Sequence, residues 1–210
     1  MNRTAWLLST VAIMSLSGCS DPAPEAVSDV VAETENRSSK EVPAVNKADS
    51  IDVGLAVGDQ VPLASNFQTS GGESNLAKIL ENGPALLVFT RSVEWCPYCQ
   101  TQLKSINSIV GELKDRGYTL YGLTYDSPDQ QDRFSKNQML QYDMLSDQNS
   151  TVIDAFGLRD PQYTEGRAAG VPYASVFAID KDGKVVAKSV SGDFKKRPSN
   201  EQILALVDAI

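Results

Sequence analysis

Histidine is absent from this 210-residue chain, and cysteine occurs only three times. Without histidine, no cysteine can be activated by a histidine base. A zinc site is also disfavoured, because zinc is usually held by four cysteine or histidine side chains, and a site of thiolates alone would need a fourth cysteine. The chemistry of the chain therefore depends on its few thiols and their surroundings.

Positive charge is also scarce. The chain has 19 Lys and Arg residues against 27 Asp and Glu residues, for a formal net charge of −8. Binding to the phosphates of nucleic acid needs clustered Lys and Arg, so we expect no nucleic acid among the partners.

Long apolar runs are missing as well. The apolar stretch at residues 5–14 follows a single positive charge and is too short to span a bilayer. It reads as a cleaved signal peptide covering residues 1–18. Leu16-Ser17-Gly18-Cys19 follows it and resembles the bacterial lipobox. That resemblance implies a lipidated Cys19 and a protein anchored to a membrane of the bacterial cell envelope, on its periplasmic or extracytoplasmic face. An ordinary signal peptide with an incidental cysteine is the alternative.

Residues 19–52 contain no aromatic residue and show no sustained periodicity, so we predict a disordered tether after Cys19. Residues 53–210 are long enough for one domain with a full core. Strand and helix patterns alternate there, which predicts an α/β domain with a mixed central β-sheet flanked by helices. We expect strands at 85–89, 118–125, 142–145, 173–179 and 185–191, and helices at 99–117, 127–137, 150–156 and from 199 onward.

The most informative segment is Trp95-Cys96-Pro97-Tyr98-Cys99. It follows the apolar run at 85–89 and precedes a helical pattern, which places the first thiol at a helix N-terminus. Free backbone N–H groups and the helix dipole favour a thiolate there. The second thiol lies one turn on, within reach for a disulfide. A static structural disulfide, and a zinc site completed by carboxylates, are the alternatives.

Residues 53–210 resemble the thioredoxin superfamily, and within it the redoxins of the AhpC/TSA (peroxiredoxin-like) type. The fold implied is thioredoxin-like. The resemblance rests on residues 57–62, 87–89 with 94–99, 125–128 with 144–147 and 155–157, and 170–183.

The resemblance implies that Cys96 attacks and Cys99 resolves, with no bound cofactor because the two sulfurs carry the redox equivalents. In the family the backbone before the loop proline, here Val171, pairs with an incoming peptide. The implied substrate-binding residues are Trp95, Pro97, Tyr98, Val171 and Pro172. Arg91 and Glu94 are candidates to stabilise a thiolate or a bound peroxide, with a solvated surface role as the alternative for each. Arg197, in the basic segment at 195–197, is a weaker candidate.

Two departures from the family pattern matter. Peroxiredoxins carry Pro and Thr or Ser at set positions before the reactive cysteine. Counted from Cys96, those positions hold Phe89 and Val93. Thioredoxins carry a buried Asp near the end of the strand before the loop, which is missing here, so Glu94 is the candidate substitute.

The first hypothesis is therefore an envelope thiol–disulfide oxidoreductase that acts on protein or small-molecule disulfides. A thiol-dependent peroxidase, with Cys96 peroxidatic and Cys99 resolving, is the alternative. A non-catalytic interaction module with an inert disulfide is the third. Both enzymatic hypotheses require an electron donor or acceptor that the sequence does not identify.

Overall fold

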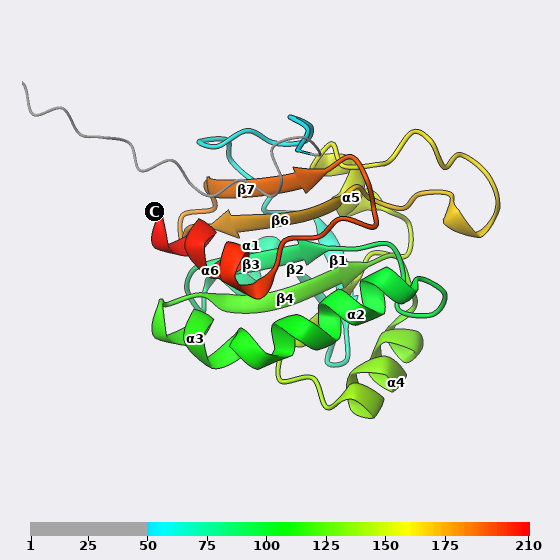
Figure 1. Cartoon of the computed structure of the whole chain (residues 1–210), viewed down its shortest axis with the longest axis horizontal. Coiled ribbons are helices and arrows are strands. Elements are labelled where there is room, and N and C mark those ends of the chain that lie inside the picture. The colour runs from blue at the N-terminus through cyan, green and yellow to red at the C-terminus, as the bar shows by residue number, and fades with distance from the viewer. Residues whose placement is uncertain (1–49) are drawn as a thin grey trace, which may run out of the picture. The chain divides into compact units, whose positions relative to one another are not determined.

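The computed structural model describes residues 50–210, so the predicted signal peptide, Cys19 and most of the tether lie outside the described residues. Seven strands form one mixed sheet in the order β2-β1-β5-β4-β3-β6-β7 (Figure 1). Their bounds are β1 Asn66–Thr69, β2 Gly72–Asn75, β3 Ala85–Phe89, β4 Thr119–Thr124, β5 Asp143–Ser146, β6 Ala174–Ile179 and β7 Val185–Ser191. Over residues 50–210, no helix is long and apolar enough to cross a bilayer.

Strand β3 lies at the centre of the sheet, parallel to β4 and antiparallel to β6. All five of its residues are buried, as expected for a strand covered on both faces. Alternate side chains enter different cores: Leu87 and Phe89 pack on one face, and Leu86 and Val88 on the other.

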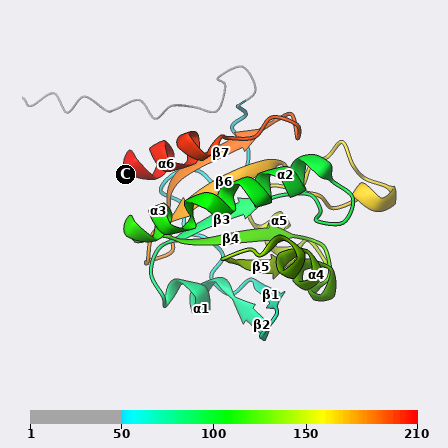
Figure 2. The same cartoon turned by 60° about the horizontal axis from the view of Figure 1, so that its bottom comes forward.

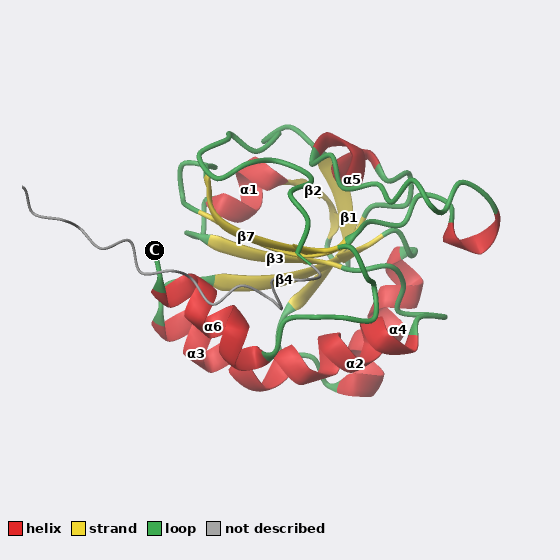
Figure 3. Ribbon diagram, turned by 45° about the horizontal axis from the view of Figure 1, so that its top comes forward, coloured by secondary structure: helices red, strands yellow, loops and turns green. Residues whose placement is uncertain are grey.

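Helices cover both faces of the sheet (Figure 3). Their bounds are α1 Leu76–Leu80, α2 Pro97–Ile106, α3 Val110–Asp115, α4 Pro128–Gln138, α5 Thr151–Ala155 and α6 Asn200–Asp208. Residues of α1 and α5 join the core of Phe89, whereas α2, α3 and α6 cover the core of Val88. The prediction of an α/β domain with a thioredoxin-like mixed sheet is confirmed.

The predicted single helix from Cys99 to Gly117 is wrong in one respect. Helix α2 ends at Ile106, a 3-10 turn spans Asn107–Ile109, and α3 follows. The Asn107 side chain donates to the Met139 carbonyl at 3.2 Å and accepts from the Gln141 N–H at 2.7 Å. These bonds tie the end of α2 to the segment after α4, so tertiary contacts accompany a break that the apolar periodicity does not show.

Two further features differ from the sequence prediction. The hairpin of β1 and β2 and the short helix α1 were not predicted, and they lie at one edge of the sheet (Figure 2). Residues 50–52, assigned above to the tether, contact β7: the Ile51 N–H donates to the Val190 carbonyl, and Asp52 pairs with Lys188 at 2.8 Å. The folded domain therefore begins at least three residues earlier than predicted.

Candidate active site

The two cysteines lie where the chain leaves β3 and enters α2. Cys96 is the N-cap of α2, and Pro97 occupies the first turn, where a missing N–H costs nothing. The Cys96 and Cys99 sulfurs form a disulfide, and the Cys99 N–H donates to Cys96 Sγ at 3.3 Å. The exposed fractions are 2% for Cys96 and 0% for Cys99. The predicted position of Cys96 at a helix N-terminus is confirmed. Both cysteines are buried, so exposure does not distinguish one thiol from the other.

Asp126, just past the end of β4, anchors the loop before the disulfide. Its carboxylate accepts from Ser92 Oγ at 2.7 Å, the Val93 N–H at 2.6 Å and Thr124 Oγ1 at 2.7 Å. The residue is 3% exposed, and burial raises the pKa of its carboxyl despite these hydrogen bonds. The sequence reasoning missed Asp126 because it sought the buried acid on β3 itself rather than on the neighbouring parallel strand.

Arg197, from the segment between β7 and α6, contacts the disulfide directly. Its Nη2 donates to Cys99 Sγ at 3.2 Å. The rest of the guanidinium is held by the Phe194 carbonyl, Thr90 Oγ1 and Gln102 Oε1, each at 2.8 Å. Burial, and then the charge of Arg91, lowers the pKa of Arg197 to about 10, so the guanidinium remains charged at neutral pH.

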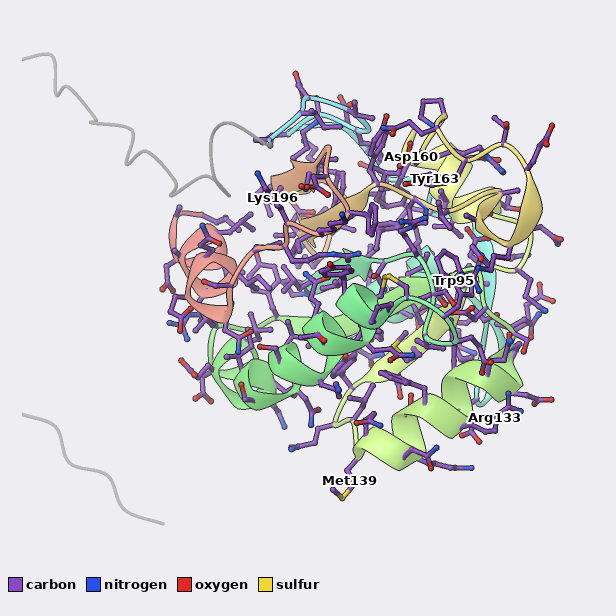
Figure 4. All side chains as sticks on the ribbon, turned by 45° about the vertical axis from the view of Figure 1, so that its right-hand side comes forward. Trp95, Arg133, Met139, Asp160, Tyr163 and Lys196 are labelled. Atoms are coloured by element: carbon purple, nitrogen blue, oxygen red, sulfur yellow. A yellow bond between two sulfur atoms is a disulfide. The ribbon has the colours of Figure 1, made fainter. Side chains whose placement is uncertain are left out.

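Arg91 is buried beside the site, at 4% exposure, rather than solvated on a surface loop. Its guanidinium carbon lies 4.2 Å from the ring centroids of Tyr163 and Phe194 and 5.1 Å from that of Trp95. These are cation–π distances. Within the described part of the chain, Arg91 Nε is buried without a hydrogen-bond partner. Figure 4 shows Trp95 and Tyr163 on the same side of the molecule, with the yellow disulfide bond near Trp95.

The other candidates around the thiols have distinct environments. Trp95 Nε1 donates to the Tyr125 hydroxyl at 2.9 Å, and that hydroxyl donates to the Arg167 carbonyl. Tyr98 is 44% exposed and packs edge-on against Phe194, with ring centroids 5.8 Å apart. Trp95 is therefore fixed in place, whereas Tyr98 and Pro97 face solvent.

Glu94 is exposed, and its carboxylate pairs with Arg133 of α4 at 3.2 Å. Within residues 50–210 the Glu94 carboxylate is paired with Arg133 and not with either sulfur, so the solvated alternative fits it better than the role of a substitute for the missing acid. The buried acid near the redox loop is Asp126, whereas Glu94 is exposed.

Val171 and Pro172 precede β6, whose residue Ser175 pairs with Phe89 at the end of β3. They are therefore at the same edge of the sheet as the redox loop. The Val171 N–H donates to the Ala168 carbonyl at 3.3 Å, and its carbonyl accepts from the Asp160 N–H at 2.9 Å. A peptide that pairs with Val171 would have to displace these two hydrogen bonds, so the Val171 backbone is not free for the peptide-binding role predicted for it.

A groove of about 440 Å³ runs along α2. Its lining residues are Pro97, Tyr98, Thr101, Gln102, Ser105, Lys195, Arg197, Pro198 and Asn200. Arg197 thus faces both the groove and Cys99 Sγ. Over residues 50–210, no three His, Cys, Asp or Glu side chains cluster in a way that could hold a metal ion.

Comparison with known proteins places these features in a family. Residues 57–188 match the AhpC/TSA family. The chain belongs to the AhpC/TSA family. It is 28% identical over 150 residues to peroxiredoxin Bcp of Escherichia coli, covering 71% of this chain and 94% of that protein. It is 26% identical over 161 residues to a thiol peroxidase of Aquifex aeolicus, covering 71% and 85%. This AhpC/TSA chain is therefore a thiol-based oxidoreductase.

Solved structures agree on the fold. Peroxidoxin BcpB of Mycobacterium tuberculosis superposes with a TM-score of 0.62 at 24% identity, covering 74% of this chain and 98% of that one. A peroxiredoxin-like protein of Aquifex aeolicus superposes with a TM-score of 0.63 at 23% identity, covering 77% and 91%. A weaker sequence match, 24% over 110 residues, joins the chain to the thiol-disulfide oxidoreductase ResA of Bacillus thuringiensis, covering 52% and 56%.

Proposed function

We propose that this protein is a thiol-dependent peroxidase that cycles between a Cys96/Cys99 dithiol and the Cys96–Cys99 disulfide. The observation that carries the proposal is a charged guanidinium, Arg197, that donates to a sulfur of a buried disulfide in an AhpC/TSA chain. A positive group at the thiol favours the thiolate and lies where negative charge develops as the O–O bond breaks.

The cycle balances without a bound cofactor. One thiolate attacks a peroxide oxygen, the O–O bond breaks, and the products are a sulfenic acid and an alkoxide or hydroxide that takes a proton from water. The second thiol attacks the sulfenic sulfur, and water leaves as the disulfide forms. Two equivalents of an external thiol then reduce the disulfide and are themselves oxidised to a disulfide.

Arg91 is the proposed second electropositive group. Its guanidinium lies in the aromatic cluster of Trp95, Tyr163 and Phe194, and no acceptor in the described chain uses its Nε. These donors are suited to a peroxide oxygen. The unmatched Pro and Thr/Ser positions, which favoured disulfide exchange at first, are then compensated by two arginines: Arg91 of the loop between β3 and α2, and Arg197 of the segment after β7.

Thiol–disulfide exchange, the first hypothesis from the sequence, remains the competing function. The dithiol pair at a helix N-terminus favours disulfide exchange. The Val171 backbone does not, because its N–H and carbonyl are already bonded within the chain and a peptide substrate would need them for pairing.

The two functions are separated by reacting the reduced protein with hydrogen peroxide and with an organic hydroperoxide in a stopped-flow instrument, beside an insulin-disulfide reduction assay. We expect both peroxides to react faster than the insulin disulfide. Peroxide rates no faster than those of free cysteine, together with rapid insulin reduction, would reject the peroxidase and support the exchange function.

We also propose that the protein works at a bacterial envelope membrane, anchored through a lipid on Cys19. The support is the lipobox-like Leu16-Ser17-Gly18-Cys19 after a short apolar segment. Lipidation would also remove the third thiol and leave Cys96 and Cys99 as the redox pair.

A further inference from the structure

We propose that Arg197 makes Cys99 the thiol that attacks the peroxide, so that Cys96 is the resolving thiol. This order is the reverse of the one that the family resemblance implied. The inference rests on the proposed peroxidase function for its substrate, but the order of the thiols can be measured without any peroxide.

The geometry of Arg197 is specific to Cys99. Three of its N–H contacts go to fixed acceptors, on Phe194, Thr90 and Gln102, and these hold the planar guanidinium in one orientation. The remaining donor, Nη2, lies 3.2 Å from Cys99 Sγ. A guanidinium held in this way needs little reorganisation when the Cys99 sulfur becomes negative, because its Nη2 already points at that sulfur.

The charge of Arg197 is not neutralised elsewhere in the described chain. Among residues 50–210, every acceptor bonded to its guanidinium is a neutral oxygen or the Cys99 sulfur. The charge that acts on Arg197 is that of another cation, Arg91, and a third cation, Lys195, lines the same groove. A buried cation without a carboxylate is costly, so the site favours an anion, and a Cys99 thiolate supplies one on reduction.

Cys96 has a weaker stabiliser. Its sulfur accepts one backbone N–H, from Cys99, at 3.3 Å. The N-terminus of α2 carries about half an elementary charge, whereas Arg197 carries a full one. Exposure does not reverse this preference, since both cysteines are almost completely buried.

Access does not separate the two thiols, because neither cysteine lines the groove and both are almost completely buried. Arg197 and Gln102 line the groove beside α2, and the same Arg197 donates to Cys99 Sγ. The step is the one balanced above: Cys99 becomes the sulfenic acid, the Cys96 thiol attacks it, and water leaves as the S–S bond forms.

The first test needs no peroxide. Rates of iodoacetamide alkylation are measured against pH for the reduced Cys96→Ser and Cys99→Ser variants, each carrying a single active-site thiol. We expect the lower thiol pKa in Cys96→Ser, where Cys99 remains. Adding Arg197→Met should raise that pKa by about one to three units and slow alkylation at mildly acidic pH at least about tenfold.

Two further variants control this result. Lys104→Met removes an exposed cation from the same helix and should leave the Cys99 pKa unchanged. Arg197→Lys keeps the charge without the fork and should give an intermediate pKa, which also decides the matter if Arg197→Met fails to fold. A lower pKa for Cys96 than for Cys99, or no response of Cys99 to either Arg197 variant, would overturn the proposal.

The second test traps the sulfenic acid with dimedone after one equivalent of hydroperoxide and locates it by mass spectrometry. Cys96→Ser should form the adduct on Cys99 and consume peroxide at close to the wild-type rate. Cys99→Ser should consume peroxide at least about tenfold more slowly, because Cys96 has no full positive charge beside it. Rapid adduct formation on Cys96 would refute the order but keep the peroxidase. If no variant outpaces free cysteine, the peroxidase function fails, and the alkylation profiles alone decide the role of Arg197.

Discussion

Removing the Asp126 carboxylate should loosen the loop that carries the reactive disulfide. Three donors converge on this carboxylate, two of them from the loop: the Ser92 hydroxyl and the Val93 N–H. The third is the Thr124 hydroxyl at the end of β4. Asp126→Ala leaves all three without their acceptor, whereas Asp126→Asn keeps the shape and one oxygen.

The loss of stability depends on which of the three donors can find another acceptor. Each buried donor left unsatisfied costs about 1–3 kcal/mol. The two hydroxyls can rotate to other acceptors, but the Val93 N–H is fixed by the backbone. We therefore expect Asp126→Ala to lower the free energy of unfolding by about 3 kcal/mol and Asp126→Asn by about 1 kcal/mol. Peroxide consumption should fall about tenfold in Asp126→Ala, because a small misplacement of the reactive group is costly.

Urea denaturation of the oxidised protein and single-turnover peroxide consumption measure the two effects. Asp147→Ala is the matched control: Asp147 is also buried, but it accepts from the N–H groups of Thr151 and Ile153 at the start of α5. It should cost comparable stability and leave the peroxide rate unchanged. A loss below about 1 kcal/mol for Asp126→Ala, less than one unsatisfied donor would cost, would refute the reasoning.

The pH dependence has a definite sign. Burial raises the pKa of Asp126 in the folded state, above about 3.9 in the unfolded chain. The folded protein therefore binds this proton more tightly. The contribution of Asp126 is fully present below the unfolded pKa and is lost as pH rises through the folded value. The stability advantage of wild type over Asp126→Asn should thus shrink as pH rises above about 4; an advantage that grows instead would contradict the raised pKa.

Three other changes test separate parts of the molecule. Cys19→Ser should move the protein from the membrane fraction to the soluble envelope or medium fraction, and unchanged fractionation would reject the lipid anchor. Glu94→Gln should change the peroxide rate less than about twofold, since its exposed pair with Arg133 is worth at most about 1 kcal/mol; a large loss would restore Glu94 as a catalytic group. Phe177→Ala should lower the free energy of unfolding by about 3–5 kcal/mol, because it empties a fully buried site, and urea denaturation showing under 2 kcal/mol would contradict that core.

The sequence alone predicted the elements whose signals are local. Ser127 and Ser199 cap α4 and α6 with complete capping boxes, at the positions where the sequence predicted that these helices begin. The turn at Asp182 and Gly183 joins β6 to β7, the two strands expected at 173–179 and 185–191. These signals lie within a few residues of what they control, because caps and turns satisfy the backbone of their own segment.

The cysteine pair and the thioredoxin-like AhpC/TSA fold could also be predicted, since a strand, two spaced thiols and a helix are contiguous. Asp126 could not, and the sequence made Arg197 only a weaker candidate than Arg91. Arg197 is 98 residues from Cys99 in the chain, and Asp126 is 33 residues from Val93. Their signals, an arginine in a basic segment and an aspartate after a strand, are common on protein surfaces. The sheet brings β4 beside β3, and the chain after β7 returns over α2, so only the tertiary structure decides which charged groups lose water and face the sulfurs.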